Sequence, residues 1–425
     1  MRASLTIAGG NLVGAGAAFA AAIVAARVLA VDEFAAFGVG LAVNSLAVQF
    51  GDFGLGTVAI AETADSANAA VARAKLRDLA LHRVRMALLV GLAVTAVVLL
   101  LPSLAPYRAT AIVGAAGAVF GSLAFFLIWS LQGERSFRAA GTMQSLQGAL
   151  RLALVGACAV AGLGSVAMMV GYAILAPAVT AVTAAFLLFA RKPRQIGEAA
   201  LEASGSTEVD LSRRRVLALT GVFAALVING DVLLLTMLSG EREVAAYTAA
   251  WRFSSGVLLI NTAIASALLP FIVRAPDAWP EAKHLVRRGL AVSAGWFALL
   301  PLMVLIGPLL LGSIGDEARG PLIVLLIAFA IDAFYFVLYQ IYLRVRRERY
   351  LLAISVVELA TMALVTILLR DQGALAPAYG QLAARVVVCG LTVAPLLLAA
   401  RGRLDWFAPA PSSPGRSRAA GAVDA

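Results

Sequence analysis

Eight ionisable side chains interrupt the long apolar stretches of this sequence: Arg27, Asp52, Arg151, Asp231, Arg252, Asp332, Glu358 and Arg385. A charge at the centre of a membrane span costs about 2.5–3.5 kcal/mol, so such a residue usually faces a cavity or a partner charge. An arginine there suits a phosphate or carboxylate ligand, because its guanidinium stays charged and can bind two oxygens at once. A carboxylate there suits a proton, a cation or an ion pair. Each of these residues therefore either has a structural role, by reaching the membrane interface or forming an ion pair, or belongs to a substrate or ion site.

Three candidates for a substrate path differ in depth and surroundings. Arg151 lies near mid-depth without an acidic neighbour, so it either binds an anion or donates to a carbonyl or to Gln147. Arg27 lies near the outer end of its span, where it can reach the interface or Asp32. Asp52 sits in a glycine-rich stretch that can bend a helix or line a cavity.

The remaining charges predict pairs in the second half of the chain. Asp231 and Arg252 lie at similar depth on consecutive antiparallel spans, and we expect an ion pair between them. Asp332 and Arg385 share a depth near the middle, which predicts a second pair. Glu358 is a candidate for a coupling proton or cation, or for a structural role.

The composition places most of these residues in lipid. The 425 residues are 61% hydrophobic and 14% charged, with a mean hydropathy of +0.91, and a soluble domain cannot hide so much apolar surface. Twelve apolar runs are long enough to cross ~30 Å of hydrocarbon as helices. They are 5–30, 36–61, 84–104, 109–131, 141–163, 165–190, 216–238, 244–273, 290–311, 321–343, 350–369 and 374–400. The fold class predicted is an all-α integral membrane protein with about twelve spans.

Basic residues orient the spans. Most of the 34 Lys and Arg residues fall in alternate loops, whereas the opposite loops hold only Arg108, Arg242, Arg319 and Arg370. Positive charge is retained on the cytoplasmic side, so both termini are expected inside. The net charge of +10 is thereby a topology signal, and we expect no nucleic-acid partner. No group of Cys, His, Asp or Glu has metal-ligand spacing, and we expect no metal and no cofactor.

The chain divides into two similar halves. Residues 1–190 and 216–400 are expected to form two lobes of six helices, with a flexible cytoplasmic linker at 191–215 and a disordered cytoplasmic tail at 401–425. Residues 32–38 (DEFAAFG) match residues 242–248 (REVAAYT) after the first span of each half, which indicates a parallel internal repeat. GxxxG spacings at Gly10 and Gly14, and at Gly117 and Gly121, predict close helix packing.

Several short features together resemble a known family. They are Asn11 in the first span, Arg27 at its end, residues 32–38 at the turn, Asp52-Phe53-Gly54-Leu55, residues 131–137 (LQGERSF), Arg151, and Ala245-Ala246-Tyr247. The sequence resembles the polysaccharide exporters (Wzx-like oligosaccharide flippases) of the MOP superfamily, which also includes the MATE transporters. The resemblance implies two six-helix lobes around a central cavity in the bacterial inner membrane.

The resemblance also implies a function. Such proteins move undecaprenyl-pyrophosphate-linked oligosaccharide across the membrane for O-antigen, capsule or exopolysaccharide synthesis, with membrane lipids and other polysaccharide-assembly proteins as partners. Asn11, Arg27, Asp52, Arg151 and Arg252 would then line the substrate path. The four arginines are balanced by four acids, so a strongly cationic cavity does not follow from the sequence. A MATE-like cation-coupled exporter is the alternative, and a membrane glycan polymerase or ligase is disfavoured because the outer loops are short. The chain is therefore expected to be no enzyme.

Overall fold

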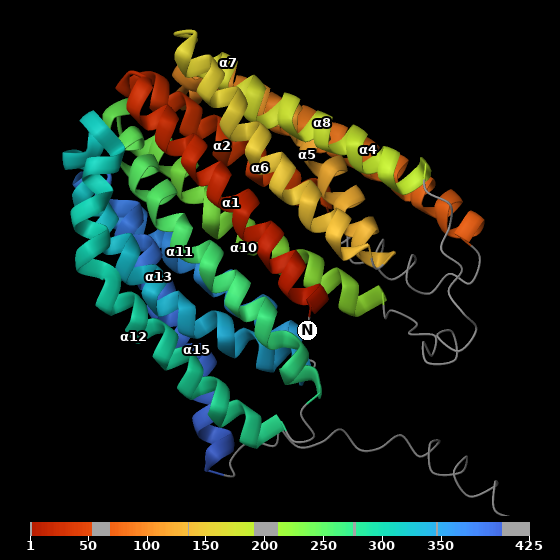
Figure 1. Ribbon diagram of the computed structural model, residues 1–425. Coiled ribbons are helices and arrows are strands. Elements are labelled where there is room, and N and C mark those ends of the chain that lie inside the picture. The colour runs from red at the N-terminus through yellow and green to blue at the C-terminus, as the bar shows by residue number, and fades with distance from the viewer. Residues whose placement is uncertain are drawn as a thin grey trace, which may run out of the picture.

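The computed structural model describes residues 2–52, 69–134, 136–190, 211–274, 278–345 and 347–401, and these are almost entirely helical (Figure 1). The first half contains α1 (Arg2–Val28), α2 (Val31–Asp52), α4 (Ala69–Leu100), α5 (Arg108–Gly133), α6 (Phe137–Val160), α7 (Ser165–Met169), the π-helical turn η2 (Val170–Leu175) and α8 (Ala176–Ala190). The second half contains α10 (Leu211–Leu238), α11 (Glu241–Arg274), α12 (Ala278–Leu311), α13 (Gly315–Arg344), α14 (Glu348–Leu368) and α15 (Leu375–Ala400). Short 3₁₀ turns precede α5, α13 and α15: η1 (Pro102–Tyr107), η3 (Gly312–Ile314) and η4 (Arg370–Gln372).

The helices confirm the predicted fold class. Each of the twelve predicted spans coincides with a helix or, for residues 165–190, with the continuous helical stretch α7–η2–α8. Ten stretches of the described residues are long and apolar enough to cross a membrane, and one of them, Val286–Tyr342, runs over both α12 and α13. The chain is therefore a polytopic membrane protein of about twelve helices.

Some predicted boundaries differ from the observed ones. Residues 53–61 of the second span, most of the linker (191–210) and the tail from residue 402 lie outside the described residues. The last five residues of the predicted linker, 211–215, are the first turn of α10. Their Leu-Ser-Arg-Arg-Arg sequence is polar, but helix propensity and continuity with the apolar run extend the helix beyond the hydrocarbon.

Glycines bring α1 and α6 together, as the GxxxG spacing predicts. A Cβ on Gly10 would lie 2.5 Å from the backbone of Gly141, and one on Gly14 would lie 2.3 Å from the carbonyl of Gln144. On α6, a Cβ on Gly148 would lie 2.1 Å from the carbonyl of Gly14. Only glycine allows this approach, which sets the polar residues of the two helices side by side.

The two halves meet through equivalent helices. Helix α1 packs on α11 and α2 packs on α10, and α2 also packs on α11. At the α2–α11 contact, a Cβ on Gly38 would lie 2.3 Å from the Thr248 side chain, and these two residues end the matching strings of the sequence repeat. Equivalent positions meeting across the boundary are what a two-fold relation between parallel repeats requires.

The halves spread apart toward one end. In Figure 1 their helices converge near the end of α1 and diverge toward the end that carries the N-terminus. The start of α1 lies at this open end (Figure 1), and the charge distribution of the sequence assigns the N-terminus to the cytoplasm. The arrangement is therefore that of an inward-facing two-lobed protein.

Candidate functional site: a cavity between the lobes

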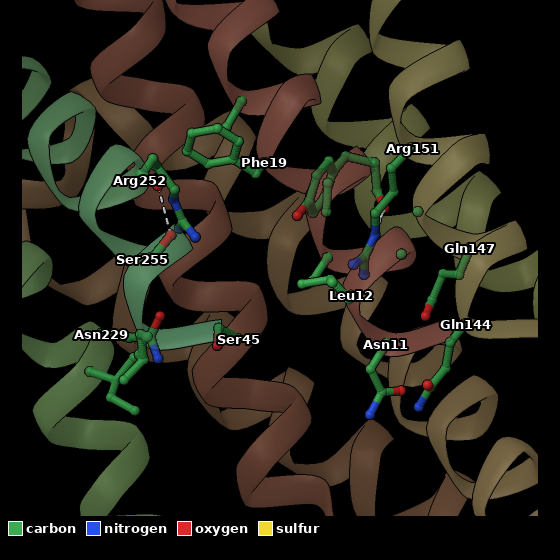
Figure 2. A pocket seen from close by; sticks show the side chains of 18 of the residues that line it. Asn11, Leu12, Phe19, Ser45, Gln144, Gln147, Arg151, Asn229, Arg252 and Ser255 are labelled. Atoms are coloured by element: carbon green, nitrogen blue, oxygen red, sulfur yellow. Dashed lines mark hydrogen bonds between the residues drawn. The ribbon is translucent and has the colours of Figure 1, made fainter. Parts of the chain in front are cut away.

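A cavity of about 490 Å³ lies between the two halves. Its walls come from α1, α2, α5, α6 and η2 on one side and from α10 and α11 on the other. Among the residues expected in a substrate path, Asn11, Arg151 and Arg252 line it. Figure 2 shows the guanidinium groups of Arg151 and Arg252 entering the cavity from opposite sides.

Arg151 is held by η2, the π-helical turn of its own lobe. Its Nε donates to the carbonyl of Tyr172 at 3.3 Å, and its guanidinium lies over the Tyr172 ring, 4.4 Å from the centroid. The hydrogen bond to a carbonyl, one of the two alternatives raised by the sequence, is therefore present. Arg151 also lines the cavity, and anion binding there stays a prediction. It makes no hydrogen bond with Gln147.

Arg252 supplies the second positive charge, from α11. Its Nε and Nη2 atoms are buried and find no hydrogen-bond partner among the described residues. Its charge lies within electrostatic range of the like charge of Arg151 and of the opposite charge of Asp231. Buried donors without partners are costly, so this guanidinium is better stabilised when an anion occupies the cavity.

Neutral polar side chains complete the walls. Gln144 and Gln147 precede Arg151 by seven and four residues on α6, and Ser255 follows Arg252 by three on α11. The spacing places each set on one face of its helix, a signal that could have marked the cavity-facing sides from the sequence. Asn229 of α10 adds a further amide.

Aromatic residues also line the cavity. Phe19, Tyr172 and Trp251 contribute to its lining. Phe19 packs on Phe253 across the lobe boundary, with ring centroids 5.8 Å apart, and the rings of Trp251 and Phe329 have centroids 4.9 Å apart. Nothing in an apolar run distinguishes an aromatic residue that faces a cavity from one that faces lipid.

The lining that the structure describes carries two arginines and no carboxylate. The balance of four arginines and four acids within the spans therefore does not extend to the cavity, which is cationic. The acids are placed elsewhere, and each has a partner.

Arg27 does not belong to the cavity. Its Nε and Nη2 donate to the carbonyls of Leu310 and Leu309 at 2.8 and 2.7 Å, at the outer end of α12 in the other lobe. The expected substrate contact is thus replaced by a link between lobes, with the cation at the negative end of the α12 dipole. The sequence could not show this, because the partners lie more than 280 positions away.

Asp52 likewise lies outside the described cavity lining. It forms an ion pair with Arg83 of α4, whose Nε donates to Ser122 at 2.8 Å. The Arg83 guanidinium also lies 5.7 and 5.6 Å from the rings of Phe126 and Trp129. Arg83 precedes the predicted span 84–104, but its side chain is buried in the first lobe.

The expected pair of Asp231 and Arg252 forms no direct ion pair, although the two charges lie within electrostatic range of each other. Asp231 is buried and instead accepts hydrogen bonds from the Tyr247 hydroxyl, from Gln381 at 2.7 Å and from its neighbour's backbone at Val232. Rotation of α11 directs Tyr247 toward Asp231 and leaves Arg252, five residues later, in the cavity. A similar depth in the membrane was therefore not enough to predict which side chains contact Asp231.

The second expected pair, between Asp332 and Arg385, is confirmed, and a third residue joins it. Arg385 Nη1 lies 3.1 Å from Asp332 Oδ1 and also forms an ion pair with Glu358. All three side chains are buried between α13, α14 and α15. This triad lies within one lobe, and none of its members lines the cavity.

These features define a two-lobed polytopic membrane protein with a cationic cavity at the lobe boundary. The polysaccharide biosynthesis protein family matches residues 1–275. The chain therefore belongs to that family. A search of curated proteins found no significant match.

Solved structures share the fold. The inward-facing conformation of a multidrug resistance MATE family transporter of the MOP superfamily is 18% identical, with a TM-score of 0.65 over 94% of this chain and 99% of that chain. The outward-facing conformation of such a transporter is 17% identical, with a TM-score of 0.61 over 95% of each chain. A third similar structure is a MOP superfamily transporter from Pyrococcus furiosus, reported to have a binding pocket of reverse polarity. It is 17% identical, with a TM-score of 0.62 over 93% of this chain and 96% of that chain.

Proposed function

We propose that this protein is a flippase that moves lipid-linked oligosaccharide across the bacterial inner membrane, for synthesis of O-antigen, capsule or exopolysaccharide. The carrier lipid would be undecaprenyl pyrophosphate. Transport would proceed by alternating access, with the lobes rocking about the cavity. The family match supports a role in polysaccharide synthesis, and the fold supports an exporter of the MOP superfamily.

The observation that carries the proposal is the charge of the cavity. One arginine from each lobe enters it, and the described lining contains no carboxylate. Two guanidinium groups suit a pyrophosphate, whose oxygens can accept from both. Amides from Asn11, Gln144 and Asn229 and the indole of Trp251 suit the hydroxyl groups and ring faces of sugars.

The same charge disfavours a MATE-like exporter of organic cations. Such a function calls for acidic residues in the cavity, whereas Asp52 pairs with Arg83 and the acids of the second lobe are bound to partners there. We assign Asp231, Asp332, Glu358 and Arg385 to the stability of that lobe. The outer connections between described helices span only a few residues, which leaves no room there for a polymerase or ligase domain.

Gene deletion with complementation tests the function. The deletion strain should accumulate lipid-linked glycan in the inner leaflet and lose surface polysaccharide. The wild-type gene should restore export and Arg252→Ala should not, although the variant protein reaches the membrane in normal amount. Arg370→Ala, which removes an exposed charge at the outer surface, is the matched control and should restore export.

Two results would contradict the flippase assignment. Normal glycan export in the deletion strain, together with altered sensitivity to cationic drugs, would favour the MATE-like alternative. Full export by Arg252→Ala would show that the cationic cavity does not bind the cargo.

A further inference from the structure

We propose that Tyr172 is a positioning residue that fixes the Arg151 guanidinium in the orientation required to bind the anionic head of the cargo. This inference rests on the proposed function and adds to it a residue that no sequence motif indicated. It concerns one wall of the cavity, where α6 meets η2.

The π-helical turn is the first observation. Residues Val170–Leu175 interrupt a helix that is otherwise α-helical on both sides. In such a turn the backbone hydrogen bonds shift to more distant partners, and π-helical turns recur at functional sites. Tyr172 lies within this turn and its carbonyl accepts from Arg151 Nε.

The Tyr172 ring is the second observation. It covers the face of the Arg151 guanidinium at 4.4 Å. The ring is itself held by Phe37 of α2, a fully buried side chain that packs against it edge-on. The ring centroids are 6.1 Å apart and the ring planes make an angle of 87°. Phe37 belongs to the string repeated in both halves, so this string supports the cavity wall from behind.

These two contacts leave one edge of Arg151 available. Nε is bound and one face is covered, while the two terminal amino groups have no hydrogen-bond partner among the residues that the structure describes. The amino groups point into the cavity beside Leu12 and Asn11 (Figure 2). This edge can bind two oxygens of a phosphate or carboxylate side by side.

The ring matters because arginine is flexible. Without a fixed orientation, Arg151 would lose rotamer freedom on binding, and that loss would weaken the interaction with the anion. A cation–π contact is strongest where water is excluded from the cation and the ring. Removing the ring should therefore weaken anion binding about tenfold, since tenfold corresponds to about 1.4 kcal/mol.

Binding of farnesyl pyrophosphate to the purified protein in detergent provides the test, with farnesol as the uncharged comparison. Tyr172→Leu should bind farnesyl pyrophosphate about tenfold more weakly, whereas Tyr172→Phe, which keeps the ring, should stay within about threefold of wild type. Phe186→Leu changes a lipid-exposed aromatic on the same span and should bind normally. If Tyr172→Leu does not fold, Tyr172→Met fills the space without a ring and is expected to show the same tenfold loss.

A double-mutant cycle separates positioning from general structure. In an Arg151→Ala background, Tyr172→Leu should cause no further loss, because Tyr172 acts through Arg151. Equal binding by wild type and Tyr172→Leu, a loss in Tyr172→Phe as large as in Tyr172→Leu, or additive losses in the cycle would each overturn the inference alone. A wild-type protein that binds farnesyl pyrophosphate no better than farnesol would overturn the proposed function as well.

Discussion

At the scale of single residues, the buried triad of Asp332, Glu358 and Arg385 shows how this protein places charge in lipid. Two carboxylates share one guanidinium, with Arg385 Nη1 in contact with both. Taking such charges out of water is costly, and their mutual attraction offsets the cost only while all partners are present. The triad therefore makes the packing of α13, α14 and α15 depend on one side chain.

Arg385→Ala should destabilise the protein by roughly 3–5 kcal/mol, because it leaves two carboxylates buried without a cation. Thermal unfolding in detergent measures the loss. Restoring neutrality in the triple variant Asp332→Asn, Glu358→Gln, Arg385→Met should recover most of the stability. An Arg385→Ala protein as stable as wild type, or a triple variant that remains unstable and inactive, would argue against a purely structural triad.

At the scale of elements, the contact of α1 with α6 decides whether the cavity exists. Glycines on both helices let the backbones approach, and this approach brings Asn11 of α1 into the same cavity as Gln144 and Arg151 of α6. Lipid provides no hydrophobic force between helices, so close van der Waals contact of small residues carries the association.

Gly148→Val should separate α1 from α6, since even a Cβ at this position would lie 2.1 Å from the Gly14 carbonyl. Overpacking of this kind costs about 1–3 kcal/mol or more, and both the unfolding temperature and transport should fall. Gly156→Val, on the same helix at a position where a Cβ meets nothing within 4 Å, is the matched control and should be tolerated. Equal unfolding temperatures for the two variants would refute the close-packing account.

At the scale of the whole molecule, the contacts between the lobes involve α1 and α2 of the first lobe and α10, α11 and α12 of the second. Arg27 links α1 to the end of α12, where Gly312, with φ of 68°, allows the chain to turn beside it. Two further contacts between the lobes lie closer to the cavity: Gly38 with Thr248, and Phe19 with Phe253. Alternating access requires all of these contacts to separate.

Arg27→Gln should favour opening of the outer face, because it removes two charge-assisted hydrogen bonds between lobes. Such bonds contribute about 1.5–3 kcal/mol each when buried and less when exposed, so about fivefold more outward opening is expected. A cysteine at Ser255, in a background without Cys158 and Cys389, reports opening through labelling by an impermeant thiol reagent from outside.

Arg108→Gln is the control for this measurement. Arg108 also donates to a carbonyl near the outer surface, that of Leu99 at 3.0 Å, but both residues belong to the first lobe. Its loss should leave labelling unchanged. Equal outer labelling in Arg27→Gln and wild type would show that Arg27 does not hold the lobes together.

The sequence by itself determined the spans, their orientation, the two-half division and the glycine-mediated packing. Each of these depends on local properties: the length of an apolar run, the placement of basic loops, and the spacing of small residues. It also located eight charges within the spans, though not the buried Arg83, and three of the five residues expected in a substrate path do line the cavity.

Only the tertiary structure decided what those charges do. Asp231 binds Tyr247 and Gln381 instead of Arg252, Arg27 joins the lobes, and Tyr172 holds Arg151. Such partners depend on the rotation of each helix about its axis. In a soluble protein an apolar stripe reveals that rotation, but lipid is as apolar as the protein interior, so apolar residues surround each span and the facing side is set by packing.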